Sequence, residues 1–255
     1  MSHHSIVCHN VHFRYPDDTS ALRGVSFSVT HGESVALVGA NGAGKSTLLM
    51  HLMGFLMPAE GEVRIGDVPV TRRTAHDIRR SIGMVFQDPD DQLFMPSVGE
   101  DVAFGPLNLG LPDNEVAIRV DDALTRVGAS HLKDRPPYRL SGGEKRAVSI
   151  ATVLAMCPNA LVMDEPSSNL DPRARRNLIG LLATFDHTKI IATHDLDLAL
   201  ELCERTIVMS DGTITADGPT QEVFSDDDLL ARSGLERPSA MKVCPVCARA
   251  RREER

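Results

Sequence analysis

The sequence predicts an α/β protein with a parallel β-sheet core, an antiparallel β subdomain and an inserted helical subdomain. In the second half of the chain, strand-like apolar runs alternate with helical patterns, which is typical of a parallel sheet covered by helices. Near the N-terminus, apolar and polar residues alternate instead, as they do in half-buried antiparallel strands. From Asp88 to about Pro158 the strand-like runs disappear and helical patterns follow, including residues 113–127 and 142–156, which indicates a helical subdomain.

The elements of the first half follow in order from these patterns. Residues 33–40, ESVALVGA, form a dense apolar run that predicts a fully buried strand, and residues 44–55 have helical spacing directly after the glycines. Four further strands are expected in this half, at residues 6–13, 25–29, 61–67 and 81–87.

Strand signals return after the helical stretch, at residues 159–165, 188–194 and 205–211, with helical patterns over 171–185 and 195–203 between them. An Asp-Gly pair predicts a closing hairpin over residues 210–218. These elements predict one domain over residues 5–225, with its core at 5–88 and 159–225 and the helical subdomain at 89–158. Residues 226–255 are predicted to be an extension that ends in a basic, flexible tail.

Composition narrows the class of protein. The chain has 255 residues and a formal net charge of -8, and this acidic balance argues against a nucleic-acid partner, which would need clustered Lys and Arg. The longest uncharged run, Ser149 to Met163, is interrupted by Pro158 and is shorter than the roughly 20 apolar residues of a spanning helix. Any membrane role is therefore expected to come through a partner. Five irregularly spaced Cys favour a reducing cytoplasm over a disulfide framework.

A phosphate-binding loop is the clearest motif. Residues 39–46, GANGAGKS, fit the pattern G-x-x-x-x-G-K-[ST], and the expected strand and helix flank it as the motif requires. The glycines let backbone N–H groups face the phosphates of ATP, Lys45 reaches the β- and γ-phosphates, and the Ser46 hydroxyl is a ligand of Mg²⁺. The motif predicts a P-loop NTPase core of the RecA-like type. The expected nucleotide-binding residues here are Gly39, Ala40, Asn41, Gly42, Ala43, Gly44, Lys45, Ser46 and Thr47.

Two adjacent carboxylates end a predicted buried strand downstream. Asp164 suits a second ligand of Mg²⁺, and Glu165 can polarise an attacking water molecule. Acids at strand ends can also serve as helix caps. Since both acids share a sheet with the P-loop, the catalytic interpretation is favoured.

A second glycine pair opens the predicted helix at residues 142–156. Ser141 and Glu144 fit a capping box, in which each side chain bonds a backbone N–H of the other. A cap does not explain Gly142 and Gly143, because each glycine costs a helix up to about 1 kcal/mol relative to Ala. The pair makes sense where a ligand approaches the backbone closely. Because the P-loop cradle is already complete, we expect this turn to reach a nucleotide held by another copy of the domain.

Five motifs in this order resemble the ATPase subunit of ATP-binding-cassette (ABC) transporters, and the resemblance runs from about Ile6 to Pro219. The motifs are the P-loop, LSGGEKRAVSIA from Leu140, VMDEP from Val162, SSNLD from Ser167 and IATHD from Ile191. The resemblance implies a head-to-tail dimer, in which each ATP lies between one P-loop and residues 141–143 of the other subunit. Closing such a pair takes about 5.5 kcal/mol of differential binding.

The same resemblance implies further site residues. Tyr15 takes the place of an aromatic residue that stacks on adenine, although a plain core role stays open. Gln87 resembles a residue that links Mg²⁺ and the attacking water to the transmembrane partner, and His194 resembles a sensor of the γ-phosphate; an ordinary strand-end histidine is the alternative. The remaining implied residues are Ser141, Gly142 and Gly143, as contacts to the opposite γ-phosphate, and Asp171, as a loop residue that communicates between the two sites. Glu144 departs from the commonest family signature, which has Gln there.

Residues 85–111 carry the most individual pattern. An apolar strip stands among the acids Asp88, Asp90, Asp91, Glu100 and Asp101, which favours a groove for a basic amphipathic helix of a membrane partner. The residues of the strip are Pro89, Leu93, Phe94, Met95 and Phe104. The alternative is a segment of the subdomain core, which would account for Phe104 and Leu107.

This stretch also resembles the ATPases of energy-coupling-factor importers, in particular the cobalt and nickel group. That resemblance implies a transmembrane coupling protein, a membrane substrate-capture protein, and a peripheral location on the cytoplasmic face of the cell membrane. The second ATPase subunit is either identical or a sister chain, and other vitamins or solutes stay open as cargo.

Two alternatives and one odd feature remain. A soluble ABC ATPase of DNA repair or chromosome maintenance would need coiled-coil insertions or basic grooves, and a small-molecule kinase would leave Gly142 and Gly143 without a role. Cys244 and Cys247 form a C-x-x-C in the tail. They are incidental cysteines of a basic terminus, half of a shared metal clip, or a redox dithiol.

Overall fold

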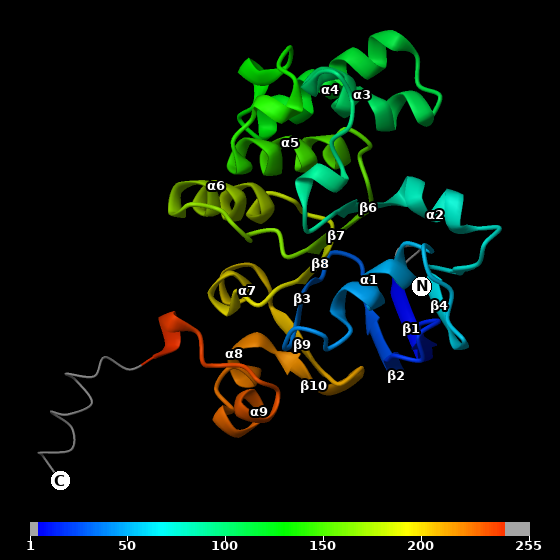
Figure 1. The fold of residues 1–255 in the computed structure, drawn as a ribbon, viewed down its shortest axis with the longest axis vertical. Coiled ribbons are helices and arrows are strands. Elements are labelled where there is room, and N and C mark those ends of the chain that lie inside the picture. The colour runs from blue at the N-terminus through cyan, green and yellow to red at the C-terminus, as the bar shows by residue number, and fades with distance from the viewer. Residues whose placement is uncertain (1–4, 243–255) are drawn as a thin grey trace, which may run out of the picture.

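Two β-sheets and a helical subdomain make up residues 5–242, the part of the chain that this computed structural model describes (Figure 1). One sheet is antiparallel, with strand order β2-β1-β4-β5, and the other has six strands in the order β10-β9-β3-β8-β7-β6. In the larger sheet all neighbouring strands are parallel except β10 and β9. The predicted fold class is therefore confirmed. The tail cysteines Cys244 and Cys247 lie outside the described residues.

The strands and helices have the following bounds. The strands are β1 Ile6–Arg14, β2 Ser20–Val29, β3 Ser34–Val38, β4 Glu60–Ile65, β5 Val68–Pro69, β6 Ile82–Val85, β7 Ala160–Asp164, β8 Thr188–Ala192, β9 Arg205–Ser210 and β10 Thr213–Pro219. The α-helices are α1 Lys45–Leu52, α2 Ala75–Ser81, α3 Val98–Asn108, α4 Asp113–Arg126, α5 Gly142–Leu154, α6 Pro172–Ala183, α7 Leu196–Leu202, α8 Thr220–Val223 and α9 Asp227–Arg232. Short 3₁₀ turns lie at Pro89–Asp91, Ser130–Leu132, Pro137–Arg139 and Ser239–Met241.

The parallel strands of the larger sheet are buried on both faces, as their apolar runs predicted. Successive residues of a strand point to opposite faces. Accordingly, Val35 and Leu37 of β3 belong to the hydrophobic cluster shared with the antiparallel sheet and α1, whereas Ala36 and Val38 belong to the cluster shared with the helical subdomain. The larger sheet is thus the middle layer of the fold, with the antiparallel sheet and α1 on one face and the helical subdomain on the other.

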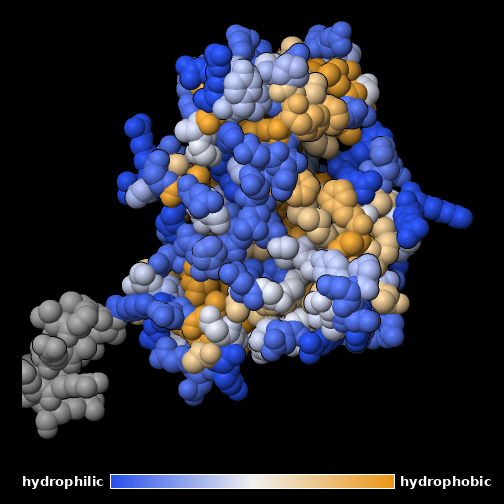
Figure 2. Space-filling view, viewed as in Figure 1, coloured by the Kyte–Doolittle hydropathy of each residue, from blue (hydrophilic) through white to orange (hydrophobic). Residues whose placement is uncertain are grey.

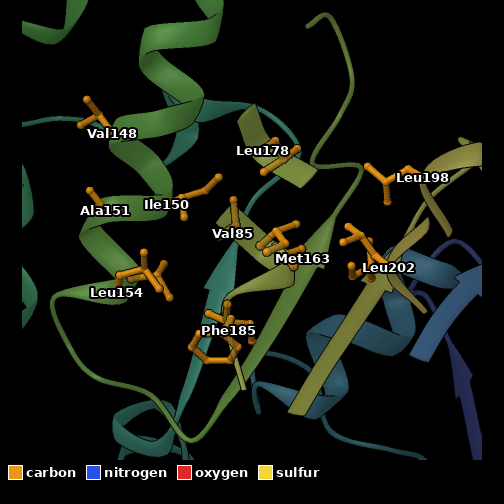
Figure 3. Packing of buried hydrophobic residues seen from close by; sticks show 14 of the residues in the cluster. Val85, Val148, Ile150, Ala151, Leu154, Met163, Leu178, Phe185, Leu198 and Leu202 are labelled. Atoms are coloured by element: carbon orange, nitrogen blue, oxygen red, sulfur yellow. The ribbon is translucent and has the colours of Figure 1, made fainter. Parts of the chain in front are cut away.

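Helix α5 connects the helical subdomain to this sheet. In Figure 3, Ile150 and Leu154 of α5 face the side of the sheet formed by Val85 of β6 and Met163 of β7, and Leu178 of α6 lies on the same side. All of these side chains are buried, so the first turn of α5 has a fixed position relative to β6 and β7.

The C-terminal part of the described chain packs onto this body. Helix α9 buries Leu229 and Leu230 in the cluster around the larger sheet. Residues 226–242, which the sequence assigns to an extension, are therefore attached to the core.

Two residues expected in the subdomain core are exposed. Phe104 is 43% exposed and Leu107 is 51% exposed. Both belong to α3, whose Val98, Val102 and Pro106 face inward, so that helical periodicity turns Phe104 and Leu107 outward. The alternative interpretation of Phe104 and Leu107 as core residues was therefore wrong.

The core of the helical subdomain gives a stability prediction. Leu124 of α4 is fully buried, so Leu124→Ala should lower the free energy of unfolding by about 2–5 kcal/mol, through lost apolar contact and the cavity left behind. Ile118 of the same helix is 67% exposed, and Ile118→Ala should stay within about 0.5 kcal/mol of the wild type. Urea denaturation of the three proteins measures the difference. Equal losses for both variants would contradict the packing of α4.

Candidate functional site

The P-loop turn connects β3 to α1 and is held in shape by glycines. Gly39, Gly42 and Gly44 have φ angles of 156°, 80° and 101°, a region that side chains rarely adopt. A Cβ on Gly39 would lie 2.2 Å from the carbonyl oxygen of Met209, and one on Gly44 would lie 2.6 Å from that of Ala21. The turn therefore needs glycine both for its conformation and for its close packing.

A cleft of about 1000 Å³ opens beside this turn. It collects side chains from the carboxyl ends of β3, β6, β7 and β8, which meet at one edge of the sheet. The predicted site residues that line it are Tyr15, Gly39, Ala40, Asn41, Gly42, Gly44, Lys45, Ser46, Thr47, Gln87, Asp164, Glu165 and His194. Ala43 is the P-loop residue that does not line it, since its side chain is buried in the core.

Lys45 lies along the P-loop with its charge buried. Its Nζ donates to the carbonyl oxygens of Gly39 and Ala40, at 2.8 and 3.2 Å. Burial lowers the pKa of Lys45, while the charges of Glu165 and Asp164 act in the opposite direction. The ammonium group is thus partly desolvated next to the open turn, where an anionic group would stabilise its charge.

Asp164 lines the cleft and has a buried carboxylate oxygen. Its Oδ1 has no hydrogen-bond partner within residues 5–242. Burial raises the pKa of Asp164, and a hydrogen bond to Ser46 and the charge of Lys45 partly offset this. The unpartnered carboxylate oxygen, the Ser46 hydroxyl and the side chain of Gln87 in the same cleft are hard oxygen donors of the kind that Mg²⁺ prefers. These residues fit a magnesium ion.

Three groups contact the same carboxylate oxygen of Glu165. Its Oε2 accepts hydrogen bonds from the Thr193 hydroxyl at 3.2 Å and the His194 backbone N–H at 3.1 Å, and His194 Nδ1 lies 2.7 Å away. Glu165 has a φ of 45°, the left-handed region, which is uncommon outside glycine. A buried carboxylate fixed in this way at the edge of the cleft can orient a water molecule and accept its proton.

Tyr15 marks the other end of the cleft. Its hydroxyl lies 3.0 Å from Thr47 Oγ1, and its ring makes an edge-to-face contact with Phe13 at a centroid distance of 5.0 Å. The ring is about one-third exposed and can pack against a flat ligand.

Residues near the C-terminus also line the cleft, and the sequence did not indicate them. They follow α9, where Gly234 has a φ of 67° and turns the chain beside Ala40. The backbone N–H of Ala240 donates to Asp197 of α7 at 2.9 Å, which fixes the segment next to the His194 loop. The lining residues of this segment are Gly234, Leu235, Glu236, Arg237, Pro238, Ser239 and Lys242.

The second glycine pair lies outside this cleft. Ser141, Gly143 and Asp171 line a separate groove of about 760 Å³ between α5 and α6, and within the described chain the two cavities have no lining residue in common. The predicted capping box is present, since the Ser141 backbone N–H and hydroxyl donate to Glu144 Oε2 at 2.8 and 2.7 Å.

The glycines of this pair have few neighbours. A Cβ on Gly142 would meet no atom of residues 5–242 within 4 Å, and one on Gly143 would meet only Ala174 Cβ, at 3.3 Å. Nothing in this part of the chain therefore requires glycine at position 142.

Fold and cleft together define a P-loop nucleotide-binding protein. A family model described as ABC transporter matches residues 22–168, more than half of the chain. A Geobacter sulfurreducens protein, named provisionally as an ABC transporter ATP-binding protein, is 64% identical over 249 residues, covering 98% of this chain and all of that protein. The chain therefore belongs to the ABC transporter family, as an ATP-binding subunit with ATPase activity.

Two further relatives are more specifically named. The energy-coupling factor transporter ATP-binding protein EcfA of Methanocaldococcus jannaschii is 47% identical over 234 residues, covering 90% of this chain and 84% of that protein. The solved structure of cbiO1 from Clostridium perfringens, described as part of the ABC transporter complex cbiONQ, superposes with a TM-score of 0.80 at 40% identity, covering 91% of this chain and 94% of that one. Among residues 5–242, every helix is too short or too polar to cross a membrane.

The P-loop geometry gives a binding prediction. Gly44→Ala should remove the rise in melting temperature that ATP with Mg²⁺ produces, because the added Cβ meets the Ala21 carbonyl oxygen and the turn must open. Gly110 is a matched control, with a φ of 77° and no atom of the described residues within 4 Å of an added Cβ. Gly110→Ala should cost about 1–2 kcal/mol of stability through backbone strain and keep the ATP-induced rise. A Gly44→Ala protein that keeps it would contradict the assignment of the cradle.

Proposed function

We propose that this chain is the ATP-hydrolysing subunit of an importer of the energy-coupling-factor type and works as a head-to-tail dimer. Its similarity to EcfA and to cbiO1 supports this class. Cobalt or nickel ions are the first candidates for the cargo, because residues 85–111 resemble the ATPases of the cobalt and nickel group of these importers. A vitamin or another solute is the alternative. The partner ATPase is a second copy or a sister chain.

The observation that supports the proposed dimer is the separation of the P-loop from the glycine-rich turn at residues 141–143. The P-loop would surround a triphosphate from one side, and Ser141 and Gly143 line a different groove, while Gly142 lines a smaller cavity beside Gln87. The first turn of a 13-residue helix offers unpaired N–H groups and a positive dipole end, which suit an anion. One chain therefore supplies half of each of two sites. In a head-to-tail pair, residues 141–143 of one copy would complete the cradle of the other.

Each cleft residue then has a role in hydrolysis. Tyr15 would stack on adenine, and Lys45 would exchange its carbonyl partners for the β- and γ-phosphates. Ser46, Gln87 and Asp164 would hold Mg²⁺, which neutralises phosphate charge when it is bound.

The residues around the γ-phosphate would carry out the chemistry. Glu165 would orient the attacking water and accept its proton. His194 would contact the γ-phosphate, and Asp171 would transmit the state of one site to the other. Loss of the γ-phosphate removes the group that both copies hold, so the pair reopens.

An exposed apolar patch supports docking to a membrane partner. Phe94 is 63% exposed and makes an edge-to-face contact with Phe104, and Leu107 lies on the same helix as Phe104. Figure 2 shows hydrophobic atoms over α3 and a second such area near β6, with a hollow between them. The buried carboxylate of Asp101 accepts from the backbone N–H groups of Phe94 and Met95, both at 3.0 Å, and so fixes the loop that presents Phe94.

The charge of the residues around this apolar patch indicates what kind of partner would bind it. Asp88, Asp91 and Glu100 are exposed nearby in the sequence. A basic amphipathic helix of a transmembrane coupling protein would match both features. This would place the chain on the cytoplasmic face of the membrane, together with a substrate-capture protein.

Gly142→Ala tests the shared nucleotide site. The substitution should raise the free energy of unfolding by about 0.5–1 kcal/mol, because it replaces a helical glycine where an added Cβ meets no neighbour. It should also lower ATP hydrolysis and ATP-dependent dimerisation by roughly tenfold or more, because the Cβ would stand between the helix and the second copy's phosphate. At Gly180 on α6 an added Cβ also meets no described atom within 4 Å. Gly180→Ala should therefore raise stability and leave ATP hydrolysis and ATP-dependent dimerisation unchanged. Full hydrolysis by Gly142→Ala would contradict the head-to-tail site.

Phe94→Asp tests the docking patch. It should lower copurification with the membrane subunits, and the stimulation of ATP hydrolysis that they produce, by about tenfold or more, since an exposed aromatic anchor is lost. Ile118→Asp changes a similarly exposed residue on α4 and should leave both unchanged. Coexpression with the genes that lie beside this one, followed by affinity purification, provides the measurement. Equal effects of the two variants would contradict the docking site.

A further inference from the structure

A charged cluster joins α6 to the loop that carries His194. Arg175 of α6 donates from Nε to Asp195 Oδ2 at 2.7 Å and from Nη2 to Asp195 Oδ1 at 3.1 Å, so its guanidinium grips both carboxylate oxygens. The Ser167 hydroxyl also donates to Asp195 Oδ2, at 3.2 Å. Both charged side chains are about one-quarter exposed or less. This geometry fixes the direction of the Asp195 carboxylate, not only its charge.

Asp195 is linked in turn to Glu165. The backbone N–H of Asp195 donates to the Thr193 hydroxyl oxygen at 3.0 Å. The same hydroxyl donates its hydrogen to Glu165 Oε2 at 3.2 Å. His194, which lies between Thr193 and Asp195, contacts that oxygen with both its backbone N–H and its ring. All three groups that hold Glu165 therefore belong to the two residues that directly precede Asp195.

The other end of this chain of contacts lies at the start of α6. Asp171 caps the helix by accepting from the backbone N–H groups of Arg173 and Ala174, at 2.8 and 2.9 Å. Arg175 is one turn further along and half-buried. The segment between Glu165 and Asp171 contains two left-handed residues, Glu165 and Asn169, with φ angles of 45° and 61°. Such conformations persist only where the surrounding contacts fix them.

The cluster does more than cap a helix. Asp195 already caps α7 by accepting from the Leu198 backbone N–H at 2.9 Å, and that bond does not need Arg175. Burial raises the pKa of Asp195, but the bonds from Arg175, Leu198 and Ser167 outweigh this and hold the pKa below its usual value. The pair therefore stays ionised near neutral pH.

We propose that Arg175 is a positioning residue for ATP hydrolysis, which through Asp195 holds Thr193 and His194 where they fix the Glu165 carboxylate. The inference rests on the proposed role of Glu165 in orienting the attacking water. It also gives α6 a direct effect on the reaction, because a displacement of α6 relative to the sheet would move Asp195 and release Oε2 of Glu165. Arg175 itself does not line the cleft and need not touch ATP.

Steady-state ATP hydrolysis by the full chain tests the proposal. Arg175→Met should lower kcat by roughly tenfold or more while the KM for ATP changes by less than about threefold, because the P-loop and Lys45, which do not contact this cluster, keep their places. Arg175→Lys keeps the charge but cannot grip both oxygens, and its kcat should lie between those of the wild type and Arg175→Met.

A second ion pair provides the matched control. Arg205 of β9 donates two hydrogen bonds to the Asp217 carboxylate of β10, at 2.6 and 2.7 Å. The two side chains are about as exposed as those of Arg175 and Asp195. Arg205→Met should lower stability and leave kcat within about twofold of the wild type. If Arg205→Met lowers kcat as much as Arg175→Met does, loss of stability explains both and the proposal is overturned.

A double-mutant cycle separates positioning from general damage. If Arg175 acts through Glu165, then Arg175→Met should change the single-turnover rate of the Glu165→Gln protein by less than about twofold. If the rate losses of Arg175→Met and Glu165→Gln multiply fully in the double variant, the proposal is overturned and the role of Glu165 stays intact. An unchanged kcat of Arg175→Met would have the same meaning. Wild-type hydrolysis by Glu165→Gln alone would remove the proposed role of Glu165, and the inference with it.

Discussion

Donors for a triphosphate occur at two places that a single chain keeps apart, and this constraint organises the molecule. The P-loop and Lys45 line one cleft, and Ser141 and Gly143 at the start of α5 line a separate groove. Since α5 is packed on β6 and β7 through buried side chains, it cannot move independently toward its own P-loop. The proposed head-to-tail pair answers this constraint, because a second copy would supply the donors that one chain cannot bring to its own P-loop. In this account, ATP acts as the contact between two subunits.

The parallel sheet explains how one cleft collects residues from distant parts of the sequence. Strands β3, β8 and β7 are neighbours, and their carboxyl ends carry the P-loop, the His194 loop and the Asp164–Glu165 pair. Ligands of open parallel sheets bind at this edge. The register places Asp164 opposite Ala192, so that Thr193 and His194 follow directly beside Glu165. The hydrogen bonds to Glu165 depend on this alignment.

Much of the fold and cleft could be predicted because the signals were local. The P-loop has a fixed pattern of glycines, the buried strands are dense apolar runs, and the capping box of α5 lies within four residues. Contacts between segments that lie far apart in the sequence could not be predicted. The cleft residues after Gly234 and the bond between Arg175 and Asp195 depend on the packing of α9, α6 and α7. Phe104 was misplaced because an apolar residue on a helix has the same sequence signal whether it faces a core or a partner.

Subunit complementation tests the shared nucleotide most directly. Lys45→Met should inactivate the P-loop half of each site, and Gly142→Arg the α5 half, so either variant alone should not hydrolyse ATP. In an equal mixture, half of the dimers are mixed and each mixed dimer has one intact site, so activity should return to about a quarter of the wild-type value. If native mass spectrometry shows mixed dimers with ATP while hydrolysis stays at the level of the separate variants, the nucleotide is not shared between copies.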